Sequence, residues 1–364
     1  MPERTQDRRL RDNPLADDLE HIITHTEDLW EDLRGQSLFI TGGTGFFGTW
    51  LLESFAWVND KLDLGARALV LTRDAEAFRR KMPHLAGHPA IRFQNGDIRN
   101  FIFPSGKFSH VIHAAATSAV ATFNNEDSLI KFDTVLEGTR HTLDFAVQCQ
   151  AKKFLFTSSG AVYGKQPSGM LRIPEEYCGA PDTLDPQAAW GESKRAAEFL
   201  CAYYGRHNGL AIKIARCFAF VGPYGQLDIH YAIGNFIRDA MHGGPIRVTG
   251  DGTPLRSYLY AADLAIWLWT ILFKGESCRA YNVGSEEEIT IAELAHAVAR
   301  SFQKPREVTI AKSPDPDAPP ERYVPSTKRA QQDLGVRQIV DLKAAIERTI
   351  VHRLSMSNRV GSNA

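Results

Sequence analysis

A short stretch near the start of the chain, residues 37–59, limits the fold more than any other feature. The apolar run SLFITGG (37–43) has the composition of a buried strand, and GFFGTWLLESFAWVN (45–59) has that of a helix. Glycines crowd the junction between them, in TGGTGFFG (41–48). A buried strand that turns at once into a helix is typical of the strand–helix units of parallel sheets.

The same alternation continues along the chain. Helices are predicted around 125–150 and 188–207, and further apolar strands at 66–74, 91–98, 110–116, 152–159 and 211–222. Continuous apolar strands separated by helices indicate a parallel sheet that is covered on both faces. The right-handed crossover rule then predicts an α/β fold with a doubly wound parallel (Rossmann) sheet.

Changes of pattern divide the chain into four expected segments. Residues 1–35 form a polar extension with one helical pattern, and residues 36–222 carry the sheet. Gly and Pro become frequent in residues 223–350, which predict a smaller mixed α/β lobe for the substrate, with 259–284 returning to the sheet domain. The polar residues 351–364 are expected to fray. In the extension, four apolar side chains are expected to cover a neighbouring surface: Ile22, Ile23, Leu29 and Leu33.

Charge and composition exclude several classes of protein. The net charge is −1, from 42 basic and 43 acidic residues, which argues against general affinity for nucleic acid or anionic membrane. The most apolar run, 259–273, contains Asp263 and is too short to span a bilayer, so it predicts a buried amphipathic helix. The charged N-terminus does not resemble a signal peptide, and the five cysteines without a CxxC pair suggest reduced thiols in the cytoplasm. No metal site is predicted.

The glycine-rich junction carries the first functional signal. Gly42, Gly45 and Gly48 are spaced three apart. Glycines permit a tight turn and let the backbone approach a pyrophosphate, while the helix N-terminus supplies N–H donors. Between a strand and a helix, this spacing predicts a dinucleotide site, to which we also assign Phe46 and Phe47.

The end of the second strand should distinguish NAD from NADP. An acidic residue there binds the ribose hydroxyls, whereas an Arg accommodates a 2′-phosphate. Here Thr72 stands where the acid would be, followed by Arg73 and Asp74. Arg73 favours NADP, and Asp74 leaves NAD open. Arg73 as a plain surface charge is the alternative.

Several segments, in order, resemble the extended short-chain dehydrogenase/reductase family, in particular its nucleotide-sugar epimerases and dehydratases. They lie within about residues 36–345 and read TGGTGFFG, NGDIRN, VIHAAA, LFTSSGAVYG, GESKRAAE, ARCFAFVGP, GDGTPLRSYLYAADLA and YNVGS. The resemblance implies a two-lobed enzyme with tightly bound NAD or NADP. It would act on a nucleoside-diphosphate sugar by transient hydride transfer at a sugar carbon. A homodimer is also implied.

The resemblance assigns several residues to the cofactor. Asp97 and Ile98 would flank the adenine, and Ala114 and Ala115 would run along the cofactor. Lys194 matches the Lys of the family's Y-x-x-x-K motif. It would hold the nicotinamide ribose and favour an anionic neighbour by its charge.

The resemblance assigns other residues to the sugar nucleotide. Ser159 matches the catalytic hydroxyl that hydrogen-bonds the sugar oxygen as it loses or gains a proton. Arg256 matches an Arg that grips the diphosphate by bidentate bonding. Arg322 is a second candidate for that contact, and Tyr163 is assigned as a further substrate contact.

Four departures from the family pattern matter. Trp190 replaces the Tyr of the motif, Ala219 stands where an Asn is frequent, and Ser257 stands where an Asp is common. Gly160 and Ala161 occupy the positions that 4,6-dehydratases fill with an Asp–Glu pair. The last departure counts against ordinary 4,6-dehydration. It leaves epimerisation, or decarboxylation of a uronic acid sugar, open.

The Trp190 departure allows three interpretations, because an indole has one N–H donor and no accessible ionisation. In the first, another residue is the base. In the second, catalysis persists weakly through Lys194, Ser159 and a water, with a changed substrate. In the third, the protein binds a sugar nucleotide without turnover, or the sequence carries an inactivating substitution. The candidate bases are Tyr163, Glu175, Glu176, Tyr177 and Cys178.

Two other function classes stay open from the sequence. One is a non-catalytic, cofactor-binding sensor or scaffold on the same fold. The other is an NADP-dependent reductase of a small carbonyl compound. Arg256 and the Gly- and Pro-rich second lobe favour the sugar nucleotide.

Overall fold

A seven-stranded parallel sheet forms the centre of the computed structural model, which describes residues 13–116, 127–228 and 231–361. The strand order is β11-β6-β5-β4-β1-β2-β3, and each neighbouring pair is parallel. This confirms the predicted doubly wound sheet. The strands are β1 (Ser37–Thr41), β2 (Arg67–Thr72), β3 (Ile91–Asn95), β4 (His110–His113), β5 (Lys153–Ser159), β6 (Ala211–Cys217) and β11 (Arg279–Val283).

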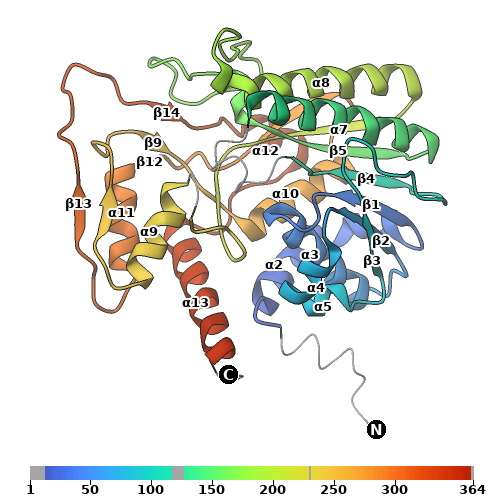
Figure 1. Cartoon of the computed structure of the whole chain (residues 1–364), viewed down its shortest axis with the longest axis horizontal. Coiled ribbons are helices and arrows are strands. Elements are labelled where there is room, and N and C mark those ends of the chain that lie inside the picture. The colour runs from blue at the N-terminus through green and yellow to red at the C-terminus, as the bar shows by residue number, and fades with distance from the viewer. Residues whose placement is uncertain (1–12, 117–126, 229–230, 362–364) are drawn as a thin grey trace.

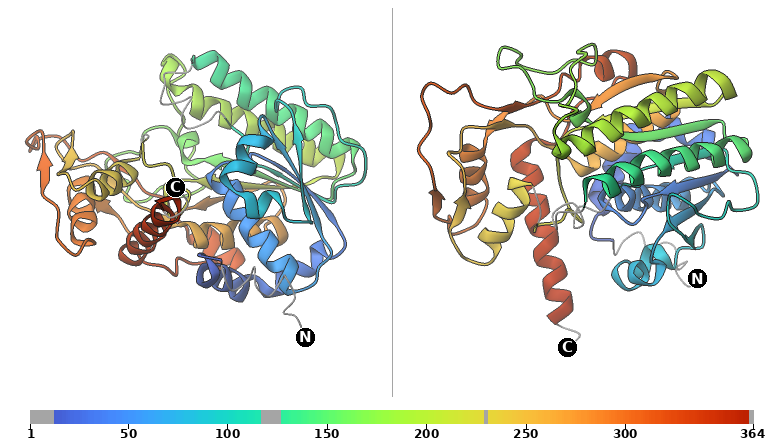
Figure 2. Two further views of the ribbon diagram at one scale, coloured as in Figure 1. Left: turned by 60° about the horizontal axis from the view of Figure 1, so that its bottom comes forward. Right: turned by 45° about the horizontal axis from the view of Figure 1, so that its top comes forward.

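Helices cover both faces of the sheet (Figure 1). One face carries α3 (Phe46–Lys61) and α10 (Ala261–Lys274), and the other carries α7 (Ser128–Gln148) and α8 (Ala189–Asn208), which pack side by side (Figure 2). The short helices α4 (Ala75–Lys81) and α5 (Pro83–Ala86) follow β2. Apolar residues of the strands are buried between these layers, as the sequence pattern predicts.

The strand predicted over 211–222 is shorter than expected. β6 ends at Cys217, and β7 (Phe220–Val221) pairs with β10 (Leu259–Tyr260) in a separate two-stranded sheet. The chain leaves the central sheet here to enter the second lobe. Apolar side chains stay buried across the break, so the apolar pattern could not reveal it.

Helix α10 differs from the amphipathic helix predicted for this run. All of its residues from Ala261 to Phe273 are buried, so it is a fully internal helix. Its carboxylate at Asp263 accepts hydrogen bonds from the backbone N–H groups of Ile339 and Val340, each at 2.9 Å, and lies 3.1 Å from His21 Nε2. These partners explain how an acidic residue fits an apolar run. Within the described ranges, no helix is long and apolar enough to cross a membrane.

The N-terminal extension packs on this internal helix. Its helix α2 (Ala16–Thr26) continues into the 3₁₀ helix η1 (Glu27–Leu33). Trp30 is buried and packs against Trp269 of α10 with the two rings tilted by 55°, at 4.7 Å between ring centroids. Four apolar residues of the extension were expected to cover a neighbouring surface. Ile22, Leu29 and Leu33 are buried, and Ile23 is half-buried.

The second lobe consists of short strands and helices beside the sheet domain (Figure 1). Its three-stranded sheet has the order β12-β9-β14, and a two-stranded sheet joins β8 to β13. β11, from the later part of the chain, pairs with β6 in the central sheet. The elements of the lobe are α9 (Ala232–Met241), β8 (Ile246–Val248), β9 (Leu255–Arg256), β12 (Ile289–Thr290), α11 (Ile291–Arg300), β13 (Val308–Ile310), β14 (Arg322–Tyr323) and α12 (Lys328–Leu334).

The C-terminal segment is helical over most of its length. Helix α13 runs over Leu342–Gly361, and the frayed end expected for 351–364 stays a prediction. Buried Ile346 and Ile350 fix the first half of this helix against the core, and helix propagation beyond such an anchor adds one hydrogen bond for each residue ordered. Residues 362–364 lie outside the described residues.

Candidate active site

The glycine loop and the end of β4 touch each other. Gly42 has φ +72°, and a Cβ there would lie 2.5 Å from the backbone of Ala114 and Ala115, so only glycine fits. Thr41 Oγ1 accepts a hydrogen bond from the Ala115 N–H at 3.2 Å. Three residues predicted to contact the cofactor are therefore brought together here, at the carboxyl ends of β1 and β4.

The start of helix α3 has the features of an anion site. Gly45 is its N-cap, and no side chain caps the helix. A Cβ at Gly45 would meet only Gly42 O, at an ordinary 3.4 Å. The described protein leaves room in front of the exposed N–H groups, which fits a pyrophosphate. Phe47 packs on Phe220, with 5.1 Å between ring centroids, so its side chain anchors the turn and its backbone faces the loop.

Phe46 has the same anchoring role. Its ring lies 5.8 Å from that of Phe47, and it packs against the core that joins the two lobes. The rings of the two predicted cofactor residues therefore hold the start of the helix in place. A Cβ at Gly48 would overlap the backbone of Gly42 and Gly43, so the third glycine allows the close packing of helix and strand.

Two guanidinium groups gather at the ends of β2 and β3. Arg73 is exposed, and Asp74 uses its carboxylate to cap α4. Asp97 pairs with Arg99, with 2.9 Å between Oδ1 and Nε. The hydrogen bond from Arg99, and more weakly the charge of Arg73, hold the pKa of Asp97 below its ordinary value. Sequence reasoning missed Arg99, although it stands two residues after Asp97.

Ile98, the other residue predicted to flank the adenine, packs against helix α7. A Cβ at Gly138 of that helix would lie 2.9 Å from the Ile98 side chain, so the glycine makes room for it. Ile98 therefore has a fixed, half-buried apolar surface beside Asp97.

Lys194 is a buried cation. Its side chain reaches from α8 to the end of β5, where Nζ donates to the Thr157 carbonyl at 2.7 Å. Nζ also lies 4.5 Å from the ring centroid of Phe156 and 5.1 Å from that of Trp190. Among the described residues it forms no ion pair. Burial lowers the pKa of Lys194 to about 8, because the more distant charge of Glu198 offsets only part of the loss of water.

The unpaired charge leads to a prediction about stability. Lys194→Met should raise the free energy of unfolding of the cofactor-free protein by about 1–3 kcal/mol near neutral pH. The loss of unfolding free energy that comes from burying the charged Lys194 amine is fully present below pH 8. It shrinks as pH rises from about 8 towards the unfolded value of 10.5, because the native amine is then already neutral. Denaturant unfolding over this pH range measures the difference. The exposed Lys343→Met is the matched control, and a difference independent of pH would contradict the burial argument.

Trp190 joins Ser159 and Lys194 into one cluster. Ser159 ends β5 and caps the 3₁₀ helix η2 (Gly160–Tyr163) by accepting from the Ala161 N–H at 3.1 Å. It also accepts from Trp190 Nε1 at 3.3 Å. The three residues predicted at the catalytic centre are thus in contact. Trp190 contributes a donor and an aromatic face, and neither can take a proton.

Tyr323 adds a phenol to this cluster. It comes from β14 of the second lobe, and the Ser159 side chain is a polar neighbour that acts to lower its pKa. A Cβ at Gly160 would lie 2.5 Å from Tyr323 Oη, so the hydroxyl lies directly over the glycine. Sequence reasoning missed Tyr323. Its only signals were its position after Arg322 and the missing side chain at Gly160.

Tyr163, expected to contact substrate or act as the base, is enclosed by protein. Its hydroxyl donates to Asn282 Oδ1 at 2.7 Å and accepts from Arg216 Nη1 at 2.9 Å. Burial raises the pKa of Tyr163 to about 12. Both hydrogen-bonding directions of the phenol are used within the fold, so this placement favours a structural role over the predicted one.

The candidate bases of the 175–178 loop have other partners. Glu175 is buried and accepts from the Asn282 N–H at 2.8 Å, and Glu176 pairs with Arg329 at 2.5 Å. Cys178 donates to the Glu176 carbonyl, and Tyr177 packs near Tyr163. In the described structure, none of their hydrogen bonds reaches the Ser159 cluster.

The two arginines predicted to bind a diphosphate lie on neighbouring strands. Arg256 on β9 pairs with Glu321, with 2.6 Å between Nη2 and Oε1, and Arg322 on β14 pairs with Glu288. In the parallel ladder Arg256 stands opposite Tyr323, so the two side chains share a face of the small sheet. The second lobe therefore presents a cation and a phenol together.

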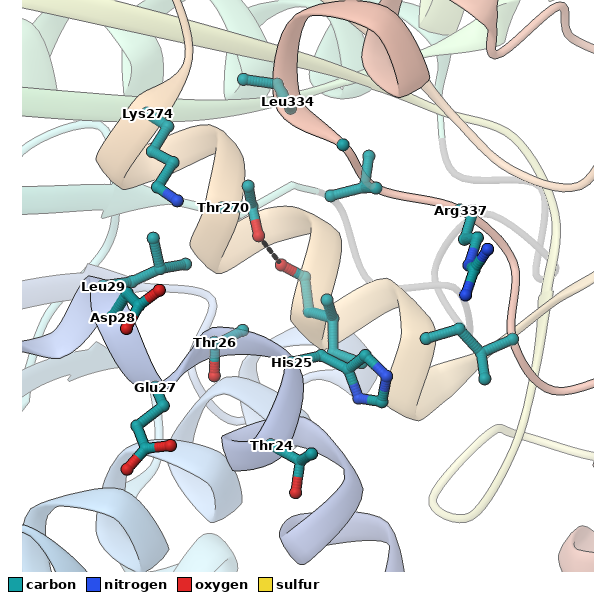
Figure 3. A pocket seen from close by; sticks show the side chains of 14 residues that line it. Thr24, His25, Thr26, Glu27, Asp28, Leu29, Thr270, Lys274, Leu334 and Arg337 are labelled. Atoms are coloured by element: carbon teal, nitrogen blue, oxygen red, sulfur yellow. Dashed lines mark hydrogen bonds between the residues drawn. The ribbon is translucent and has the colours of Figure 1, made fainter.

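A cavity of about 410 Å³ lies elsewhere, where the N-terminal extension meets α10 and the segment after α12 (Figure 3). His25, Asp28 and Lys274 are among its lining residues, and none of the predicted site residues is. A second cavity, of about 490 Å³, is lined by Glu175 and Arg216. Neither is lined by Ser159, Trp190 or Lys194, so the cluster of predicted chemistry is distinct from both.

Known proteins resemble this chain over most of its length. Residues 38–284 match the sequence profile of the NAD dependent epimerase/dehydratase family. UDP-glucuronic acid decarboxylase 1 of Xenopus tropicalis is 27% identical over 315 residues, which cover 86% of this chain and 71% of that protein. UDP-glucuronic acid decarboxylase 6 of Arabidopsis thaliana is 28% identical over 312 residues, which cover 85% and 86% respectively.

Solved structures share the fold. DesIV of Streptomyces venezuelae, a dTDP-glucose 4,6-dehydratase solved with NAD bound, has a TM-score of 0.72 and 25% identity, covering 89% of this chain and 98% of that one. Epimerase Mth375 of Methanothermobacter thermautotrophicus has a TM-score of 0.77 and 23% identity, covering 93% and 98%. At this identity the second likeness concerns the fold alone.

Proposed function

Because this chain belongs to the NAD dependent epimerase/dehydratase family, we propose that it carries out hydride transfer at a carbon of a nucleoside-diphosphate sugar. The observation that carries the proposal is the contact of Ser159, Trp190 and Lys194 at the end of β5. The cluster keeps a serine hydroxyl and a buried cation next to the predicted cofactor loop. A structural role alone gives no reason to bury an unpaired lysine.

The residues around the glycine loop fit a dinucleotide. Gly42, Gly45 and Gly48 would lie along the pyrophosphate, and Lys194 would hydrogen-bond the nicotinamide ribose. When bound, the cofactor supplies the nicotinamide that accepts and returns the hydride. The chain's own part is to hold it against the sugar, to exclude water, and to move the hydroxyl proton.

NADP is the cofactor that the charges favour. Arg73 and Arg99 stand at the ends of β2 and β3, and Asp74 is occupied as a helix cap. Two guanidinium groups suit a 2′-phosphate. The name of the family and the NAD bound to DesIV make NAD the alternative.

The cofactor preference is tested at Arg73. Arg73→Ala should weaken NADP binding about tenfold to hundredfold and leave NAD binding almost unchanged, because only NADP carries the 2′-phosphate. Calorimetric titration of both cofactors measures this. An exposed arginine far from the loop, Arg172→Ala, is the control. Equal losses for the two cofactors would make Arg73 a bystander.

The sugar nucleotide is proposed to lie between the lobes, with its diphosphate on Arg256. The Glu321 carboxylate that now pairs with Arg256 is largely exposed, so this pair is weak and gives way easily. Arg322 is tied to Glu288 and has a smaller exposed fraction, which makes it the second candidate.

Arg256→Ala should weaken binding of UDP-sugars about tenfold to hundredfold, since a charge-assisted hydrogen bond contributes about 1.5–3 kcal/mol. Glu321→Gln should act in the opposite direction, because it releases Arg256 from its partner. Calorimetry with UDP-glucose, and with the dinucleotide as a control ligand, measures both. Unchanged UDP-glucose affinity in Arg256→Ala would show that Arg256 does not bind the diphosphate.

The type of reaction is proposed from what the site lacks. Gly160 and Ala161 offer no acid–base pair for ordinary 4,6-dehydration. Epimerisation needs the hydride and proton steps at one carbon. Decarboxylation of a uronic acid sugar needs the same oxidation, then release of CO₂ from the carboxylate on the neighbouring carbon and uptake of one proton from water at that carbon before the hydride returns. The relatives named UDP-glucuronic acid decarboxylase make the second reaction the one to test first.

A protein that binds the same ligands without turnover is the alternative class. Trp190 favours it, because an indole cannot take the sugar hydroxyl proton. Native mass spectrometry of freshly purified protein tests the binding proposal shared by both classes. It should show the mass of a dinucleotide, and it also shows whether the protein is a dimer. Protein that carries no dinucleotide and gains none when NAD and NADP are added would contradict the proposal.

A homodimer is proposed through helices α7 and α8. Their outer faces expose apolar side chains, and the two helices lie together at one side of the molecule (Figure 2). The exposed apolar residues are Leu129, Ile130, Val147, Phe199 and Tyr203. A second copy would bury this surface, as homodimer interfaces are rich in apolar area.

The five free cysteines suit a reducing compartment, and we propose the cytoplasm.

A further inference from the structure

We propose that Tyr323 supplies the ionisable hydroxyl that Trp190 lacks, and that Trp190 and Ser159 orient it. This inference rests on the proposed function, since it names the group that exchanges a proton with the sugar. It differs from the expected pattern, because Tyr323 comes from β14 of the second lobe and Trp190 lies on α8.

The hydrogen bonds around Ser159 have a fixed direction. Ser159 Oγ accepts from the Ala161 N–H at 3.1 Å and from Trp190 Nε1 at 3.3 Å. A serine hydroxyl accepts twice and donates once, so its single proton is left for a third partner. Tyr323 Oη lies over the adjacent Gly160, and Ser159 acts to lower the pKa of this phenol, so we assign that proton to Tyr323. The indole cannot accept a proton from Ser159. The series of donors therefore runs from Trp190 through Ser159 to Tyr323. Donation to the phenol oxygen stabilises its phenolate form.

The surroundings of Tyr323 are shaped for its hydroxyl. The side chain that Gly160 lacks would collide with Oη at 2.5 Å. The Tyr323 ring packs on Phe218, with 4.7 Å between ring centroids. In the ladder Tyr323 stands opposite Arg256, the proposed diphosphate contact. A sugar nucleotide held by Arg256 would therefore lie on the same face of the small sheet as the phenol.

The Tyr323 phenolate would take the proton of the sugar hydroxyl. With a dinucleotide bound, the hydride of the same carbon would leave to the cofactor, so that a sugar carbonyl and a neutral phenol would remain. The reverse step returns the same proton to the sugar oxygen. The phenolate arises beforehand by loss of the phenol proton to solvent.

Several groups set how readily that phenolate forms. Burial raises the pKa of Tyr323, and the nearby Tyr231 and Cys217 add to the increase. The Ser159 hydrogen bond and the charge of Arg256 act in the opposite direction. The phenolate fraction therefore increases about tenfold per pH unit below the pKa, and the hydride-transfer rate should follow it.

The first test measures hydride transfer in a single turnover with the cofactor-loaded protein. Tyr323→Phe should reduce the rate about a hundredfold and remove its rise with pH. The same change combined with Trp190→Tyr should restore transfer, because the hydroxyl then comes from position 190. Tyr204→Phe, which removes a phenol hydrogen-bonded to Asp144, is the matched control. Unchanged transfer in Tyr323→Phe would overturn the role of Tyr323. No transfer in either the parent or Trp190→Tyr would overturn the proposed function.

The second test does not depend on activity. Tyrosine labelled at the hydroxyl-bearing ring carbon reports each phenol's ionisation by NMR in the cofactor-free protein, and Tyr323→Phe identifies the signal. Ser159→Ala should move the ionisation of Tyr323 upwards by about 1–2 pH units, since a hydrogen bond to the phenolate is lost. Trp190→Phe should move it in the same direction, because Ser159 is then free to rotate away. A Tyr323 signal that titrates identically in all three proteins would overturn the orientation by Trp190 and Ser159.

Discussion

Gly45→Val is expected to abolish dinucleotide binding while the fold survives. Among the described residues, a Cβ at this position meets only Gly42 O, at 3.4 Å, so the described cofactor-free structure accepts the change. A valine side chain would fill the space in front of the α3 N-terminus, where the pyrophosphate must approach the backbone. The affinity for NAD and NADP should fall roughly hundredfold or more. Calorimetry measures the loss.

The control for this change is Gly169→Val, because an added Cβ at Gly169 has no described atom within 4 Å and Gly169 has no positive φ. Thermal unfolding of both variants should stay close to that of the parent without cofactor. Only Gly45→Val should lose the stabilisation that added dinucleotide gives. Full cofactor affinity in Gly45→Val would remove the assignment of the glycine loop.

Trp190→Tyr is expected to increase hydride transfer about 10²-fold to 10⁴-fold, the range that a positioned general base contributes. The new phenol would stand beside the buried charge of Lys194, which has no anionic partner among the described residues. That charge should lower the pKa of the phenol, and the phenolate should raise the pKa of Lys194 from about 8. Stopped-flow absorbance of the reduced nicotinamide measures the rate.

Trp190→Phe separates the hydroxyl from the change in ring size. It removes the indole donor to Ser159 and supplies no acid or base, so the rate should not rise. If Trp190→Phe gained as much as Trp190→Tyr, relief of crowding by the indole would be the cause, and the proton-transfer account would be wrong.

Local signals in the sequence predicted the sheet correctly, because each strand is a buried apolar run next to a helix. The glycine loop was predictable for the same reason: Gly42, Gly45 and Gly48 act within one turn. The break after Cys217 was not predictable, because the half-buried Phe220 and the buried Val221 keep the apolar pattern while they change sheets. Helix α13 extends past its buried half because helix propagation is cooperative, and amino-acid composition alone does not reveal this.

The site was predictable where its residues follow one another along the chain. Ser159, Trp190 and Lys194 lie at the end of one strand and the start of the next helix, and the structure brings them into contact. Tyr323 was not predictable, because the pairing of β14 with β9 determines where its hydroxyl lies. The loop with Glu175 and Glu176 was a reasonable guess for the base, yet its carboxylates are used by Asn282 and Arg329.

The most direct test of the account is a single-turnover measurement of nicotinamide reduction after mixing cofactor-loaded protein with UDP-glucuronic acid, UDP-glucose or dTDP-glucose. The parent, Trp190→Tyr and Lys194→Ala are compared at several pH values. The account predicts slow reduction in the parent that rises with pH, faster reduction in Trp190→Tyr, and loss of both cofactor affinity and turnover in Lys194→Ala. A parent that transfers hydride at ordinary enzymatic rates, about 1–10³ s⁻¹, and loses this on Trp190→Tyr would contradict it.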